Sequence, residues 1–194
     1  TLIDGDGDIV TAVLTIGIVN TIPTGGQSFA TVDDDGLTGP PAGNPDSIID
    51  DVTVPNGDGD DNEATFGGTL AFTSGDAPNV LSFAGMDGLA GAIGVGGEAV
   101  TYGWNALTNT LTATSLRGAV FSVQITDVNT GTYKVTLLKN VLHELGPNEE
   151  NALDPTVALT YSIVDNDGSD ATGTLTITFD DDAPTAVNDT DPVG

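Results

Sequence analysis

Apolar and polar residues alternate along much of the chain with a period of two, which is typical of β-strands buried on one face. In TGTLTITF, for example, Leu175, Ile177 and Phe179 share one side of the strand and Thr residues take the other. The pattern predicts strands near Val10–Val19, Phe29–Val32, Ala64–Thr73, Val80–Ala84, Ala99–Trp104, Thr110–Leu116, Ala119–Thr126, Thr132–Leu138, Val157–Val164 and Thr172–Phe179. Turns rich in Gly and Asn separate the strands at roughly 8–12 residue spacing, which predicts an all-β, Ig-like or Greek-key β-sandwich.

Two segments depart from this pattern. The stretch LLKNVLHELG is helix-like, and we expect one or two helical turns there before Gly146-Pro147 ends them. Residues 33–63 are rich in Asp, Gly, Pro and Asn, with one apolar pair at Ile48–Ile49. A loop of this length in a compact domain is usually functional or disordered, and bound cations could order it.

Charge changes this picture more than any other feature of the composition. Among 194 residues, 29 acids face three bases, for a formal net charge of -26, yet 38% of residues are hydrophobic, which is enough for a core. Thirteen acids lie in residues 1–63 and twelve in 141–194, but only four in 64–140, so the acids gather in loops around a nearly neutral body. With so few bases, nucleic acid and anionic membranes are poor partners. We expect no insertion into a membrane, because no apolar run is long enough to span one.

The start and the end of the chain carry the same unit of acidic loop, strand and X-Pro-Thr. A shift of 161 positions superposes residues 3–24 on 164–185 with nine identities among 22 positions. Chance similarity of Thr- and Ile-rich strands is one explanation, and tandem domains are the other. The tandem interpretation divides the chain into a terminal strand and junction of a preceding repeat (1–24), a β-sandwich domain (25–185) and a linker to the next domain (186–194). Because the chain begins at Thr1 rather than Met, we expect it to be a fragment.

Clustered carboxylates repel each other, by roughly 4 kcal/mol for two charges about 4 Å apart at an effective dielectric of about 20. Three bases cannot neutralise 29 acids, so an external cation is expected. Oxygen ligands in flexible Gly-rich loops favour Ca²⁺, although no loop has the EF-hand spacing, and a site would need two loops. The alternative is that each cluster is a solvated acidic turn. The candidate ligands are Asp4, Asp6, Asp8, Asp33, Asp35, Asp58, Asp60, Asp61, Glu63, Asp165, Asp167, Asp170, Asp180 and Asp182.

Few residues point to catalysis, and we expect no enzyme activity. His143 is the only histidine, and its HELGP context lacks the second His of a zinc-protease motif. With no cysteine, disulfides and thiolate sites are excluded. Tyr102 and Trp104 share one face of a strand, where they are either core residues or a sugar-stacking platform. Alternating Thr residues could contact ice or glycans, but solvent-facing Thr is ordinary on strands.

The stretches VDDDGLTG, GDGDDNEATFGGTL and LTYSIVDNDGSDATGTLTITFDDDAPTA, with the repeat of the last near residue 4, resemble tandem domains of the repeats-in-toxin (RTX) adhesins of Gram-negative bacteria. The resemblance covers nearly the whole chain, although the glycine-rich nonapeptide repeats of that family are absent. It implies a Ca²⁺-stabilised β-sandwich exported by type I secretion to the bacterial cell surface. By resemblance, Asp165, Asp167 and Asp170 lie in the loop before the last strand, and residues 180–182 lie at the next junction. The first junction departs from the family pattern, because residues 19–21 contain no acid.

The resemblance implies an extender domain of an extracellular adhesin fibre, which projects binding modules for cell adhesion and biofilm formation. Its expected partners are neighbouring domains of the same fibre, and the domain itself is expected to be a monomer. The alternative is a module of the same adhesin that binds a glycan, a peptide or ice.

Overall fold

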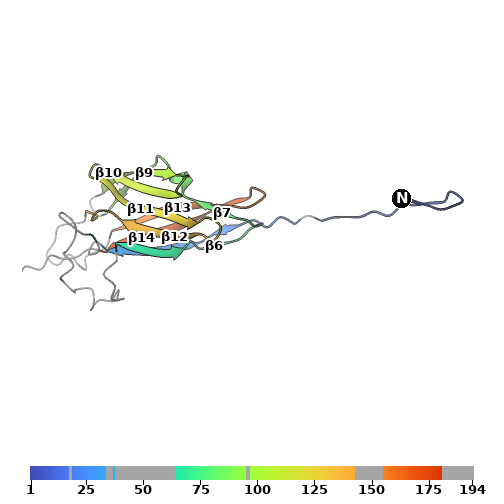
Figure 1. The fold of residues 1–194 in the computed structure, drawn as a ribbon, viewed down its shortest axis with the longest axis horizontal. Coiled ribbons are helices and arrows are strands. Elements are labelled where there is room, and N and C mark those ends of the chain that lie inside the picture. The colour runs from blue at the N-terminus through green and yellow to red at the C-terminus, as the bar shows by residue number, and fades with distance from the viewer. Residues whose placement is uncertain (18, 34–36, 38–63, 95–96, 143–154, 181–194) are drawn as a thin grey trace, which may run out of the picture.

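The computed structural model describes residues 1–17, 19–33, 37, 64–94, 97–142 and 155–180 (Figure 1). Within these ranges the protein is all-β, apart from a short 3₁₀ turn, η2 (Ala84–Met86). The strands are β1 (Leu2–Ile3), β2 (Ile9–Val10), β3 (Thr24–Gly25), β4 (Gln27–Asp33), β5 (Thr65–Thr69), β6 (Phe72–Thr73), β7 (Val80–Ser82), β8 (Ala90–Ile93), β9 (Glu98–Asn105), β10 (Thr110–Ser115), β11 (Gly118–Asp127), β12 (Thr132–Leu137), β13 (Thr156–Val164) and β14 (Asp170–Asp180).

Two larger sheets form the body of the molecule. One has six antiparallel strands in the order β5-β12-β11-β10-β9-β8, and the other has the order β4-β14-β13-β7. In the second sheet β14 is central, because it pairs antiparallel with β13 and parallel with β4. Short ladders join β3 to β6 and β1 to β2. The last of these lies far from the body in Figure 1, at the end of an extended N-terminal segment.

The two larger sheets share one hydrophobic core. On β14 the buried residues are Leu175, Ile177 and Phe179, while the Thr residues between them are partly exposed. Phe179 meets Phe121 of the six-stranded sheet with ring centroids 5.3 Å apart, so the cores of the two sheets are continuous. The Tyr133 hydroxyl also crosses between the sheets and donates to the Phe29 carbonyl oxygen at 3.1 Å. The period-two pattern therefore separates core from surface as alternation predicts.

The all-β prediction is confirmed, and most predicted strands match observed ones to within a few residues. The predicted strand Val10–Val19 is wrong beyond Val10, because residues 11–17 pair with no strand among the described residues. Residues 137–142 contain no helix, and the rest of the helix-like stretch lies outside the described residues. Strand β8, with the small-residue sequence AGAI, was not predicted.

The aromatic pair on β9 belongs to the core. Tyr102 is 4% exposed, and its ring lies over Gly91 on the neighbouring strand β8. Trp104 is partly buried and packs against Phe83 with ring centroids 6.3 Å apart. A sugar-stacking platform needs an exposed aromatic face, so the core interpretation of Tyr102 is correct.

The chain enters the body at one end and leaves the four-stranded sheet at the other. Thr24 of β3 leads directly into β4, which runs parallel to β14 from Gln27 beside Thr174 to Asp33 beside Asp180. Both strands therefore finish at the same end of the sheet. The loop between β13 and β14 lies at the opposite end, where the N-terminal segment arrives (Figure 1). The β13–β14 loop and the last residues of β4 and β14 therefore lie at opposite ends of the sheet.

Candidate metal centre

The loop between β13 and β14, residues 165–169, is a tight turn held by its own acids. The Asp165 N–H donates to the Ser169 carbonyl oxygen at 3.0 Å, and Asp165 Oδ1 accepts the Ser169 N–H at 2.8 Å. Gly168 has a φ of 94°, a left-handed conformation that favours glycine. Asp167 Oδ1 accepts the N–H and the hydroxyl of Ser169, at 3.1 and 3.0 Å. The short polar sequence DNDGS therefore brings both carboxylates to the same residue, Ser169.

A second loop, residues 74–79 between β6 and β7, packs against the first. The Asn166 N–H donates to the Asp76 carbonyl oxygen at 2.9 Å, and the Asp76 N–H donates to Asp165 Oδ2 at 3.3 Å. Asn79 is 5% exposed and stiffens this loop, since its Oδ1 accepts the Gly75 N–H at 3.2 Å. The two loops are 89 positions apart in sequence at the Asp76–Asp165 contact, so only the fold brings them together.

The N-terminal linker, residues 19–22, completes this end of the molecule. The Thr21 N–H donates to Asp76 Oδ2 at 3.3 Å, and the Asn20 side-chain amide donates to the Ser169 hydroxyl at 3.1 Å. A side chain at Gly75 would collide with the Asp165 carboxylate, with the Thr21 carbonyl oxygen (2.7 Å) and with Pro23 (2.8 Å). The linker therefore lies against both loops at a point where only glycine leaves room for the oxygens.

These contacts gather three carboxylates, which we call the junction triad: Asp76, Asp165 and Asp167. One oxygen from each lies within 4.8 Å of the others. Asp165 is buried, Asp76 is intermediate and Asp167 is exposed, so the triad extends from the interior to solvent. Among the described residues no Lys or Arg side chain forms an ion pair with these carboxylates. Each pair of charges at this separation repels by roughly 3–4 kcal/mol at an effective dielectric of about 20, which favours a bound cation or a shared proton.

The pKa of Asp167 is held below its ordinary value of 3.8, first by the hydrogen bond with the Asp165 carboxyl and then by the N–H and hydroxyl of Ser169. The lowered pKa keeps the Asp167 carboxylate ionised further into the acidic range than an ordinary Asp. Carboxylates, a backbone carbonyl and a hydroxyl are oxygen ligands of the kind that Ca²⁺ prefers. The junction triad, with the Thr21 carbonyl and the Ser169 hydroxyl beside it, could therefore hold a metal ion that takes oxygen ligands.

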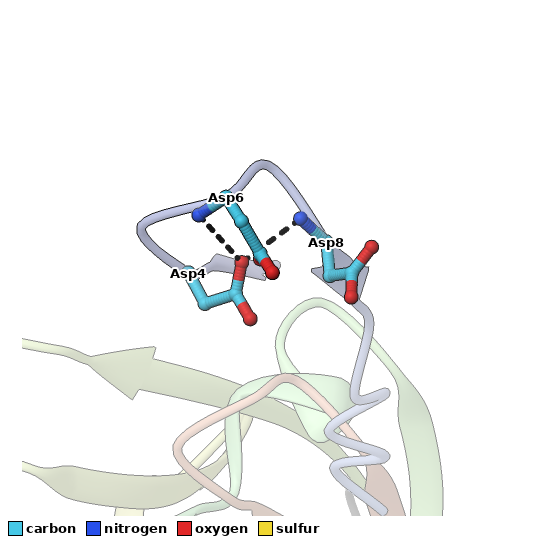
Figure 2. Close-up of side chains that lie close together, drawn as sticks. All are labelled: Asp4, Asp6 and Asp8. Atoms are coloured by element: carbon cyan, nitrogen blue, oxygen red, sulfur yellow. Dashed lines mark hydrogen bonds between the residues drawn. The ribbon is translucent and has the colours of Figure 1, made fainter.

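A second group of acids, Asp4, Asp6 and Asp8, lies in the turn between β1 and β2 (Figure 2). Asp4 Oδ1 accepts the N–H groups of Asp6, Gly7 and Asp8 at 3.3, 3.1 and 2.9 Å. The pKa of Asp4 is lowered, first by the hydrogen bond with the Asp6 carboxyl and then by the Asp8 N–H. All three residues are exposed, and no second loop approaches them among the described residues. This group can hold an ion only weakly on its own, because it offers few ligands.

The remaining predicted ligands separate into three sets. Asp170 begins β14 opposite Val164 and is outside the junction triad. Asp33 and Asp180 are neighbours at the far end of the parallel β4–β14 pair, and Asp33 is buried. The other candidates lie outside the described residues: Asp35, Asp58, Asp60, Asp61, Glu63 and Asp182.

Sequence reasoning missed Asp76. It is one of only four acids in residues 64–140, and it belongs to no acidic cluster of the sequence. The surrounding SGDAPN is rich in turn-forming residues and could have marked a loop, but not its neighbour. Residues 19–21 contain no acid, but the structure supplies carboxylates at this junction from the two loops of the body.

No family model, curated protein or solved structure matches the chain. Among the described residues no helix is long and apolar enough to cross a membrane.

Proposed function

We propose that this chain is a Ca²⁺-stabilised extender domain of a bacterial cell-surface adhesin fibre, with an Ig-like, Greek-key β-sandwich fold. The observation that carries the proposal is the position of the junction triad. Its three carboxylates come from two loops of the body, and the linker from the N-terminal segment lies directly against them. An ion bound there would tie together two loops and the linker.

The mechanism is electrostatic. Asp76, Asp165 and Asp167 would hold the ion, and its divalent charge would replace the repulsion among the three carboxylates with attraction. The linker is then held at both Asn20 and Thr21, whose polar groups already contact Ser169 and Asp76. Bending at this junction becomes costly because it would separate ligands from the ion. The domain thereby acts as a stiff spacer without any catalytic role.

The path of the chain also supports an extender. The linker arrives beside the junction triad, whereas β4 and β14 finish at the opposite end with the neighbouring residues Asp33 and Asp180. Strand β14 has 11 residues, which at about 3.3 Å per residue spans roughly 35 Å. Each such domain would add its own length to a fibre, with acidic residues at both ends.

The proposed setting is the bacterial surface after type I secretion, with neighbouring domains of the same fibre as partners in adhesion and biofilm formation. Extracellular Ca²⁺ modules bind with Kd of about 10⁻⁴–10⁻³ M. Millimolar calcium outside the cell would fill such a site, while the low calcium of the cytoplasm would leave the acidic loops repelling each other. The chain would then stay loose during export and become rigid outside.

Thermal unfolding with chelator and with 10 mM Ca²⁺ (chosen as about 10–100 times the expected Kd) tests the proposal. We expect a higher Tm with Ca²⁺ for the wild type and a much smaller increase for Asp165→Asn. The matched control is Asp87→Asn, which removes the same charge but keeps an oxygen that accepts the backbone N–H of Trp104. An equal Ca²⁺ response in Asp165→Asn and in the wild type would remove the junction triad as the site. No response in any variant would remove the proposed function.

A further inference from the structure

The hairpin at the start of the chain, residues 2–10, has the same geometry as the hairpin between β13 and β14. In each hairpin, the two residues before a five-residue turn pair with the two residues after it. The paired positions of the first hairpin correspond to those of the second under the 161-residue shift of the sequence repeat. The pairs are Leu2–Val10 and Ile3–Ile9 in the first hairpin, and Ile163–Ala171 and Val164–Asp170 in the second.

The two turns also share their hydrogen bonds. In the first, Asp4 Oδ1 accepts the Asp8 N–H at 2.9 Å, and in the second Asp165 Oδ1 accepts the N–H of Ser169 at 2.8 Å. The backbone bond that closes each turn measures 3.1 Å in the first and 3.0 Å in the second. The glycine at the fourth position of each turn has a positive φ, 99° in the first and 94° in the second. The two turns that are similar in sequence therefore also have the same local structure.

The surroundings of the two hairpins are opposite. Leu14 and Ile16 are 83% and 74% exposed, whereas their counterparts Leu175 and Ile177 are fully buried between the sheets. An isolated two-stranded hairpin is at best marginally stable in water. The alternating apolar residues of the N-terminal segment therefore indicate a strand whose sheet is not part of the described residues.

We propose that residues 2–17 are the last hairpin of a β-domain that precedes this one in the same polypeptide. Residues 11–17 would occupy the place of β14 in that domain, parallel to its counterpart of β4 and antiparallel to its counterpart of β13. The strand would close one domain, and the linker after it would open the next beside the junction triad. Consecutive domains would thus be connected by one continuous strand and linker, without a freely bending segment between them.

A second copy of this chain is a poor alternative partner. Gly173 of β14 lies against the Tyr161 ring, and a Cβ at this position would overlap the ring carbon Cζ and the hydroxyl. The corresponding residue of the N-terminal segment is Ala12. Ala12 cannot enter the β14 position of this body without displacing Tyr161, so the preceding domain has a smaller or displaced residue at the Tyr161 counterpart. The partner is a related domain with a different core.

A tandem protein in which residues 20–162 stand ahead of residue 2 tests the proposal, with amide hydrogen exchange followed through Thr11 to Gly17. In the single chain we expect rapid exchange across this segment. In the tandem protein with Ala12→Gly in the second unit, exchange should slow by about 100-fold or more, as in a central strand. The matched tandem protein that keeps Ala12 should show weaker protection. Equal, rapid exchange in both tandem proteins would overturn the proposal.

A second variant guards against a tandem protein that fails to fold. Only four residues of 171–178 differ from 10–17, so Ala171→Val, Thr174→Val and Thr178→Gly convert β14 into the N-terminal sequence with Gly173 retained. We expect this triple variant to fold cooperatively, and the further change Gly173→Ala to lower Tm by about 5–10 °C. A triple variant that does not fold would contradict the proposal. Sedimentation of the single chain tests the alternative partner. A dimer in which Thr11–Gly17 is protected from hydrogen exchange would show that a second copy of this chain is the partner and would overturn the proposal. All arms are run in chelator, so they succeed or fail independently of Ca²⁺ binding.

Discussion

Replacing Gly75 by Ala is the most informative small change at the candidate metal centre. The added methyl group would meet the Asp165 carboxylate, the Thr21 carbonyl oxygen and the Pro23 ring at once. Two of these three obstacles are backbone or ring atoms, so movement of the Asp165 side chain alone cannot relieve the strain. Overpacking of this kind costs about 1–3 kcal/mol, which for a domain of this size lowers Tm by about 2–12 °C.

The same substitution should also reduce the effect of calcium. A site with Kd of about 10⁻⁴–10⁻³ M gains about 1.4–2.7 kcal/mol of stability at 10 mM Ca²⁺ through mass action. That gain corresponds to an increase in Tm of about 3–10 °C. Because the methyl group of Gly75→Ala pushes apart two of the candidate ligands, most of this increase should be lost.

Differential scanning calorimetry with chelator and with Ca²⁺ measures both effects. The matched control is Gly103→Ala on β9, where a Cβ meets nothing within 4 Å, so that the chain loses only unfolded-state freedom and is stabilised by about 0.4–1 kcal/mol. If Gly75→Ala has the same Tm and the same Ca²⁺ response as Gly103→Ala, the close approach of linker and loops is refuted.

The remaining predictions concern charge. Because the pKa of Asp167 is lowered in the folded state, its ionised form stabilises the fold above the ordinary pKa of 3.8, and this contribution is lost as the pH falls through the folded value. In chelator, the Tm of the wild type should therefore fall more steeply with decreasing pH than that of Asp167→Asn in the acidic range below about pH 4. Parallel curves of Tm against pH would contradict the lowered pKa of Asp167. A second prediction concerns Arg117, which donates two hydrogen bonds to the nearly buried Glu98 carboxylate, at 2.8 and 2.6 Å. Arg117→Ala should cost about 1–2 kcal/mol in urea unfolding, and the double variant with Glu98→Gln should recover part of this loss; strictly additive effects would show that the pair does not interact.

The body of the fold could be predicted because alternation is a local property of the sequence. Strand β14 reveals its core face through Leu175, Ile177 and Phe179 without knowledge of its neighbours. The order of the sheets is not local, and neither is the short strand β8, whose small residues carry no clear alternation. The N-terminal segment shows the limit of this reasoning. Its pattern predicts a strand through Val19, but a strand forms only where a partner supplies hydrogen bonds, and beyond Val10 none is present among the described residues.

Only one of the two loops that form the candidate site could be predicted from the sequence. The run of acids and glycine at residues 165–169 identifies a loop with clustered carboxylates, and the need for a second loop follows from the small number of ligands. Asp76 could not be paired with Asp165 from sequence, because 89 positions separate them and a lone Asp has many ordinary roles in turns. Asp170, two residues beyond Gly168, appeared equivalent in sequence, yet pairing with Val164 places it on the strand and outside the group.

A crystal structure of the chain grown in saturating Ca²⁺ tests the central claim most directly. The account predicts an ion bonded to oxygens of Asp76, Asp165 and Asp167 at about 2.3–2.6 Å, with the Thr21 carbonyl turned toward it. A junction triad without an ion at saturating Ca²⁺, and with the linker detached from the two loops, would contradict the account.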